Sequence, residues 1–256
     1  MRSFLAFTRK EITYQVRSGK LVLLTILFML FGIMNPAIAK LTPWLLETMA
    51  DSLAESGMNV TAVTVSAMDS WVQFFKNIPM ALIAFVLLEG SLFTAEYESG
   101  TLVLSLTKGL SRAKVVLSKA AVLTMLWSFG YWLCFAVTYG YNAYFWDNSI
   151  AQNLWLSVII WWVFGLWVIS LMVLFSVMVK TGSMVLVGTG GVVFGCYLLG
   201  MVPKIKDYLP TLLTDGNSLI YGTANADTYT APLLLTIAMT VIFVVVSIPL
   251  FSKKKL

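Results

Sequence analysis

The chain has 256 residues, of which 59% are hydrophobic and only 11% are charged, and its formal net charge is +5. This composition is far from that of a soluble domain and indicates a membrane protein. The sequence contains no histidine, which excludes Ser-His-Asp and Cys-His catalysis as well as histidine-ligated zinc and haem.

Long apolar runs predict an all-α polytopic membrane protein that forms a single domain over residues 1–256. A helix needs about 20 mostly apolar residues to cross the hydrocarbon. The runs show no period-2 alternation, which argues against a membrane barrel. Six runs qualify, and we expect spans at residues 21–39, 78–95, 120–144, 154–179, 183–202 and 231–251.

Residues 1–20 precede the first span and combine apolar and basic side chains. On a helical wheel, an apolar arc holds Met1, Phe4, Leu5, Ile12 and Val16, and an adjacent basic arc holds Arg2, Arg9, Arg17 and Lys20. This pattern predicts an amphipathic helix in the membrane interface, with its cations near anionic headgroups. The alternative is an ordinary positive flank that only fixes the topology.

Residues 40–76 are expected to form an extracellular segment, with residues 44–56 as a short amphipathic helix. We expect Trp44 and Trp71 at the membrane surface, where tryptophan is enriched. The segment could be a lid or a rim that faces the substrate, or it could simply pack over the bundle.

The second predicted span carries Glu89, which is a charged residue clearly inside a span. A charge in the bilayer is costly, so Glu89 should face protein or water. We favour a structural hydrogen bond, or an ion pair with a basic residue of the N-terminal helix, over contact with a substrate.

The mixed stretch ESGTLVLSLTKGLSRAKVVLSK, residues 98–119, interrupts the apolar sequence and predicts a short cytoplasmic helix. Ser99 can cap a helix that runs to Thr107, and Gly109 can end it. Glu96 and Glu98 lie at the end where the helix dipole favours negative charge.

One side of this short helix is apolar, because Leu102, Leu106 and Leu110 follow a spacing of four. That spacing suits a helix held against something. Ser111 can cap a further helix that continues into the third span.

The later spans are joined by a short outer connection at residues 145–153 and a tight cytoplasmic turn before residue 183. Gly191 and Gly195 form a G-x-x-x-G pair, which allows close helix approach either within this chain or across a dimer. Residues 203–230 form a second extracellular segment, partly apolar enough to be re-entrant.

The distribution of Lys and Arg predicts that both termini are cytoplasmic. Most of these residues lie in the N-terminal segment, in residues 108–119 and at the C-terminus. The net charge is thus a topology signal and gives no reason to expect a nucleic-acid partner. Cys134 and Cys196 lie in predicted spans and are interpreted as packing residues. Neither a phosphate loop nor a dinucleotide fingerprint is present, so we expect this chain to bind no ATP, other cofactor or metal.

The segment at residues 96–119 resembles the one that follows the second span in ABC-2-type permeases, the membrane subunits of ATP-binding-cassette transporters. The pattern is Glu-x-x-x-Gly-Thr-Leu, then a stretch rich in Leu, Ser and Thr, then Ser-Arg and a later Lys; here it comprises Glu96, Gly100, Thr101, Leu102, Leu104, Leu106, Thr107, Ser111, Arg112 and Lys119. The organisation of the whole chain is similar too. One departure is Gly109, where family members often have proline.

The resemblance implies a plasma or inner membrane protein whose 99–112 coupling helix docks on a separate ATPase subunit that binds ATP and Mg²⁺. It also implies two ATPase copies and a second permease chain, identical or related. The residues expected to meet the ATPase are Glu96, Glu98, Gly100, Thr101, Leu102, Leu106, Ser111, Arg112 and Lys119. The alternative is a loop that is amphipathic by coincidence.

Together these features predict a non-enzymatic permease subunit, an exporter whose cargo is a peptide or another amphipathic molecule. The rival hypothesis is a stand-alone membrane protein. It could be a secondary transporter, although one intramembrane glutamate is thin support for ion coupling, or a scaffold that recruits a cytoplasmic partner through the same helix.

Overall fold

The computed structural model describes residues 2–49, 64–107 and 109–254. Regular structure in these residues is helical only, and six helices are long and apolar enough to cross a membrane. The predicted all-α polytopic fold is therefore confirmed. The long helices are α2 (Lys20–Thr48), α4 (Ala67–Glu89), α7 (Arg112–Phe145), α8 (Leu154–Met178), α9 (Gly182–Leu199) and α12 (Thr230–Lys253).

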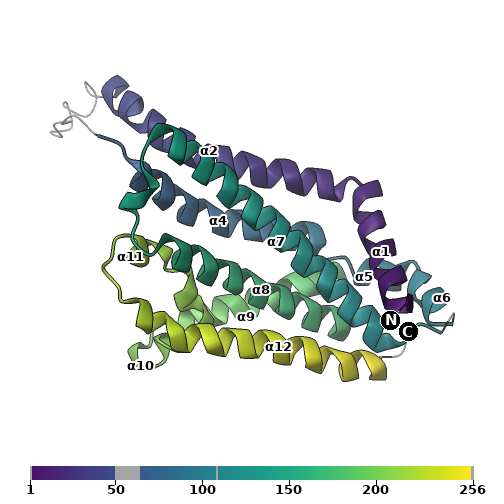
Figure 1. Cartoon of the computed structure of the whole chain (residues 1–256). Coiled ribbons are helices and arrows are strands. Elements are labelled where there is room, and N and C mark those ends of the chain that lie inside the picture. Colours follow the sequence, from purple (N-terminus) through teal and green to yellow (C-terminus); the bar gives the residue numbers. More distant parts are fainter. Residues whose placement is uncertain (1, 50–63, 108, 255–256) are drawn as a thin grey trace.

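Shorter elements lie at the two ends of the bundle that the long helices form (Figure 1). The end that carries both chain termini, called the terminal end below, also holds α1 (Arg2–Arg17), α5 (Thr94–Glu98) and α6 (Thr101–Thr107). The connections at the opposite end contain α10 (Pro203–Lys206), α11 (Gly216–Ile220) and three 3-10 helices, η1 (Asn148–Ile150), η2 (Pro210–Thr214) and η3 (Ala226–Tyr229).

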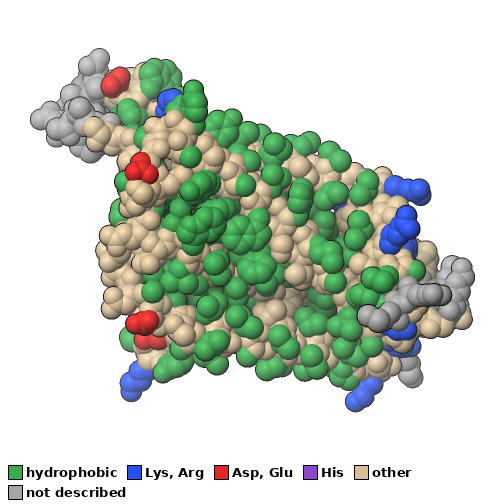
Figure 2. Space-filling model, in the orientation of Figure 1, with side chains coloured by type: hydrophobic (Ala, Val, Ile, Leu, Met, Phe, Trp, Pro, Cys, Tyr) green, Lys and Arg blue, Asp and Glu red, His purple; other side chains and the backbone are tan. Residues whose placement is uncertain are grey.

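Charged and hydrophobic side chains separate along the bundle. Figure 2 shows hydrophobic side chains over the middle of the visible face, Lys and Arg gathered at the terminal end, and Asp and Glu together with a few basic residues at the opposite end. An apolar band between two charged ends is what a bundle of membrane-spanning helices needs, because charges are costly in hydrocarbon.

The core of the bundle is centred on α8, the most buried of the six long helices. Its sequence is apolar on every side, which is typical of a helix surrounded by others, and it packs against α7, α9 and α12. Gly165 of α8 lets the Trp127 ring of α7 approach closely, because an added Cβ would clash with that ring. The two helices therefore pack closely at this point.

The connection between the first two spans is shorter than the predicted 40–76 segment. Helix α2 continues to Thr48, and α4 already begins at Ala67. Residues 44–48 are thus the last turn of α2 and Met49 is its C-cap. Residues 50–56 of the predicted short helix lie outside the described residues. Trp71 is not at the surface: it is 0% exposed, and its indole Nε1 donates to Asn148 Oδ1 at 3.1 Å. This hydrogen bond to Asn148 satisfies the indole N–H, which makes burial of the ring favourable.

The G-x-x-x-G pair of α9 has no packing partner within the described chain. A Cβ added at Gly191 or Gly195 would meet nothing within 4 Å, whereas one at Gly188 would lie 2.5 Å from Cδ1 of Phe175. The close approach between α8 and α9 is therefore made at Gly188. The expectation of intramolecular packing at Gly191 and Gly195 is wrong, and the dimer alternative stays a prediction.

Part of the 203–230 segment folds back onto the bundle. Leu213 and Leu219 are fully buried, and the indole of Trp161 in α8 donates to the Thr214 carbonyl at 3.0 Å. Asp215 caps α11 by accepting from the Ser218 amide at 3.2 Å. These contacts close the opposite end of the core over α8.

Candidate coupling site

Two glycines shape the segment from α5 to α7. Gly100 has a φ of +66° and Gly109 a φ of +86°, and this left-handed conformation is readily adopted only by glycine. Gly109 ends α6 as predicted. Gly100 separates α5 from α6, so Ser99 is the C-cap of α5 and does not begin a helix. Ser111 does stand before α7, but its side chain makes no capping hydrogen bond.

The leucine row of this segment packs within the chain and does not form the exposed face that we expected. Leu102 is 1% exposed and belongs to the hydrophobic core, and Leu106 and Leu110 are half-buried against that core. Helical periodicity shows which residues share a face, but it does not show what covers the face. Among the α6 side chains that the structure describes, Thr101, Val103 and Thr107 are exposed, Val103 by 44%.

Glu96 and Lys119, both predicted to meet a partner, are paired inside the chain. The Lys119 ammonium is 1% exposed and lies 3.0 Å from Glu96 Oε2 and 2.8 Å from Glu11 Oε2. It also donates to the Leu92 carbonyl at 3.0 Å. A buried cation is tolerated only with such partners, so the expectation that Lys119 contacts another subunit is wrong.

Lys10 completes a group of two cations and two anions, Lys10, Glu11, Glu96 and Lys119, called the charge cluster below. Its Nζ is 3.1 Å from Glu11 Oε1 and also pairs with Glu96. Burial lowers the pKa of Lys10, but the hydrogen bond that Lys10 donates to Glu96 and the charges of both carboxylates outweigh this effect, so the pKa of Lys10 lies above its usual value. The charge cluster is neutral overall and joins α1, α5 and α7.

Glu89 makes the ion pair that we expected with the N-terminal segment. Its carboxylate is buried; Oε2 accepts from Gln15 Nε2 at 2.6 Å and lies 3.8 Å from Lys20 Nζ. Lys20 also donates to the Leu88 carbonyl at 2.8 Å. Glu89 is therefore held by α1 and by the start of α2.

Helix α1 presents a polar side to the bundle and an apolar arc away from it. Phe7, Thr8, Glu11 and Gln15 are buried, whereas Leu5, Ile12 and Val16 of the predicted apolar arc are exposed. The Thr8 hydroxyl is 2.8 Å from that of Ser118. The sequence reading missed Glu11 and Gln15, although their spacing of four from Phe7 marks one helical face.

Arg112 binds the C-terminal end of α12 through one nitrogen of its guanidinium. Its Nη1 donates to the carbonyls of Phe251, Ser252 and Lys254 at 2.7, 3.1 and 2.6 Å. The last carbonyls of a helix lack intrahelical partners and carry partial negative charge, so a guanidinium there is favourable. Whether the half-buried Arg112 also contacts the ATPase stays a prediction.

The chain end beyond α12 is also fixed. Lys254 Nζ donates to the Val179 carbonyl at 2.6 Å and lies 4.0 Å from the centre of the Tyr97 ring. Burial, assisted by the charge of Lys180, lowers the pKa of Lys254 to about 8. Helices α5, α7, α8 and α12 thus meet at the terminal end.

The remaining predicted residues lie at the edge of this junction. Gly100 and Thr101 are exposed at the start of α6, where the Thr101 hydroxyl is 2.9 Å from that of Ser99. The Glu98 side chain lies outside the described part of the structure. The described residues contain no group of three His, Cys, Asp or Glu that could hold a metal ion. The charge cluster and Arg112 link helices at the terminal end, which suits transmission of movement between helices more than acid–base chemistry.

A second buried polar group, also missed from the sequence, links the long helices nearer the middle of the bundle. Asn35 of α2 donates to Thr138 of α7 at 3.0 Å and accepts from Asn77 of α4 at 2.8 Å. The Thr138 hydroxyl donates to the Gly32 carbonyl at 3.0 Å. Hydrogen bonds of this kind hold membrane helices together.

The chain matches a protein family over nearly its whole length. The family is described as ABC-2 family transporter protein, and the match covers residues 5–256. It therefore includes most of α1, the charge cluster and α6, and is not confined to the segment whose residues carry the resemblance. The curated proteins give no match to the chain.

Proposed function

The chain belongs to the ABC-2 transporter family, and we propose that it exports an amphipathic cargo, driven by a separate ATPase subunit that docks on α6. The family match and the six candidate spans make it a multi-pass permease subunit of an ABC transporter. ATP and Mg²⁺ would bind on the ATPase subunit, so the permease chain itself would not be an enzyme.

The observation that carries the docking proposal is the way α6 is attached. Its inner side is anchored in the core through Leu102, and the adjoining α5 is tied to α1 and α7 through the Glu96–Lys119 pair. Its outer side leaves Val103 exposed. Helix α6 itself lies at the tip of the terminal end (Figure 1). A displacement of α6 would therefore be transmitted to α1, α5 and α7 together, because packed cores do not deform continuously.

The orientation and assembly follow from charge and packing. The basic terminal end (Figure 2) supports cytoplasmic termini in the cell membrane by the positive-inside rule. In that orientation an ATPase subunit could reach α6. The open space beside Gly191 and Gly195 supports contact with a second permease chain. Two permease chains would present two copies of α6 to two ATPase subunits.

The cargo proposal rests on the character of the interior. The core is apolar and rich in aromatic side chains, such as Trp71, Trp127 and Tyr131. These three side chains are fully buried, but the described helices also expose many large apolar side chains. Such a surface favours a molecule with a large apolar side, and a peptide is the class that we propose. A hydrophobic compound of another class would be an equally good test substrate.

Replacement of Val103 by Asp tests the docking proposal without opening the core. The new charge would lie on the outward face of α6, so we expect an ATPase subunit encoded beside this chain to stop co-purifying with the variant. Ser18→Asp, exposed at the same end, is the matched control and should retain the ATPase. Normal co-purification of both variants would show that α6 is not the docking element.

A further inference from the structure

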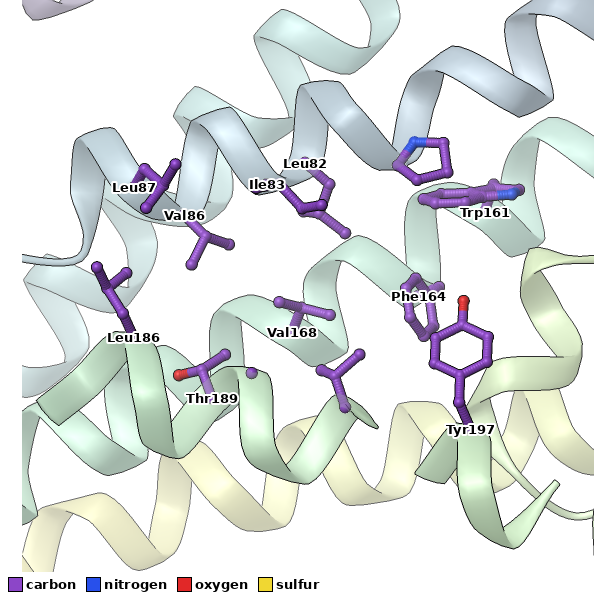
Figure 3. A pocket seen from close by; sticks show the side chains of 13 residues that line it. Leu82, Ile83, Val86, Leu87, Trp161, Phe164, Val168, Leu186, Thr189 and Tyr197 are labelled. Carbon is purple, nitrogen blue, oxygen red and sulfur yellow. The ribbon is translucent and has the colours of Figure 1, made fainter. Parts of the chain in front are cut away.

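An elongated groove lies between α4, α8 and α9. Its volume is about 270 Å³. Figure 3 shows α4 side chains on one wall, α9 side chains on the facing wall and α8 side chains between them. The lining includes Ile83 and Val86 of α4, Trp161 of α8, and Thr189, Gly190 and Tyr197 of α9.

The groove is long and apolar. It runs along α9 from Leu186 to Tyr197, a distance of about 16 Å at 1.5 Å per residue. Its lining is almost entirely hydrocarbon and aromatic ring. Helix α9 is little buried by the rest of the described chain, so the groove lies beside a helix that the surrounding lipid can reach. This shape fits a linear hydrocarbon better than a compact ligand.

One polar group in the groove is left without a partner. The Thr189 side chain is 1% exposed, and its hydroxyl has no hydrogen-bond partner among the described residues. The other polar atoms of the lining are satisfied: the Tyr197 hydroxyl donates to Thr214 Oγ1 at 3.2 Å and the Trp161 indole to the Thr214 carbonyl at 3.0 Å. An unpaired buried hydroxyl costs free energy that a ligand oxygen would remove.

We propose that the groove binds one acyl chain, whose carbonyl oxygen accepts a hydrogen bond from the Thr189 hydroxyl. From Thr189 the apolar tail would extend about 12 Å along α9 toward Trp161 and Tyr197. The chain could belong to a bilayer phospholipid or to a free fatty acid, since both carry an acyl carbonyl. This binding requires neither an ATPase subunit nor export, so it goes beyond the function proposed above.

Photo-crosslinking of the full chain in vesicles of phosphatidylethanolamine and phosphatidylglycerol tests the site. Two probes are used: a palmitic acid with a diazirine in its tail, and a phospholipid that carries the same tail. Adducts mapped by mass spectrometry should concentrate on Ile83, Val86 and Val193, which line the groove. Labelling there by the phospholipid identifies a bilayer chain; labelling only by the free acid identifies a fatty acid.

Gly190→Leu fills the groove from α9 without a predicted clash, because an added Cβ meets nothing within 4 Å. We expect it to abolish the groove adducts. Gly140→Leu makes the same change at an equally open position on α7 and should leave them intact. Two results would overturn the proposal. One is an equal yield of groove adducts in the two variants, and the other is a yield along α9 that with both probes simply increases with the exposure of each residue.

Thr189 itself is tested by two small substitutions. Thr189→Val keeps the shape and removes the hydroxyl, so groove labelling should fall by about two- to tenfold, the range that one net hydrogen bond corresponds to. Thr189→Ser keeps the hydroxyl and should label like the unmodified chain. Equal labelling of the Val and Ser variants would refute the carbonyl contact at Thr189.

Discussion

At the scale of single residues, the stability of the terminal end depends most directly on Lys119. Its ammonium is fully buried between Glu11 and Glu96. The net value of a buried pair is often small, but loss of one partner leaves the others buried and uncompensated. The charge cluster is therefore more sensitive to loss of one member than to loss of a balanced pair.

Lys119→Met should destabilise the chain by about 3–5 kcal/mol, because it leaves two carboxylates with Lys10 as their one remaining cation in the charge cluster. The measurement is denaturant unfolding of the purified protein in detergent. Glu11→Gln combined with Lys119→Met removes one charge of each sign and should recover part of the loss. If Lys119→Met alone were as stable as the unmodified chain, the charge cluster would contribute little to the free energy of unfolding.

Lys254 gives a pH-dependent prediction at the same scale. Its pKa is lowered to about 8, first by burial and then by the charge of Lys180. Amine reagents attack the neutral form, so modification of Lys254 should rise with a midpoint near pH 8, well below that of an ordinary lysine near 10.4. Lys180→Gln removes a repelling charge and should shift the midpoint upward. A midpoint above pH 10 in the unmodified chain would contradict this environment.

At the scale of elements, short segments at the terminal end link the long helices to one another. Helix α1 binds α4, α5 and α7 through its polar side, and Arg112 at the start of α7 binds the last carbonyls of α12. No long helix that meets these bridges can shift alone without breaking a charge-assisted hydrogen bond.

Arg112→Gln should loosen the last turn of α12, because the three carbonyls lose a cationic donor. Hydrogen exchange of the amides near Ser252 is the readout, and we expect clearly faster exchange there. Lys114→Gln is the control: Lys114 is a nearby cation of α7 whose hydrogen bond goes to Ser3, so the α12 amides should not change. Equal exchange in both variants would exclude the proposed link.

The sequence predicted the elements well and their partners poorly. Apolar runs identified all six spans, because lipid forces backbone groups to bond within helices. They did not locate the end of α2, which continues past Pro43 to Thr48. Nor could they pair Glu11 with Lys119, since 108 residues separate the two, or show that Leu102 faces the core.

At the scale of the whole molecule, the unpacked face of α9 predicts an assembly. Gly191→Leu adds bulk to open space, so the isolated chain should stay folded while a dimer packed through this face is weakened. The measurement is the monomer–dimer equilibrium in detergent, followed by analytical ultracentrifugation. Gly140→Leu, equally open on α7, should leave the equilibrium unchanged. An unaffected dimer in the Gly191 variant would place the interface elsewhere.

The central claim is that α6 couples this permease to a separate ATPase subunit. The most direct measurement is the ATP turnover of that subunit in vesicles, with the unmodified chain, with its Val103→Asp variant, and alone. The account predicts that the unmodified chain changes the turnover and that the variant gives the turnover of the ATPase subunit alone. Equal turnover in all three vesicles, together with cargo movement under an ion gradient without ATP, would contradict the claim.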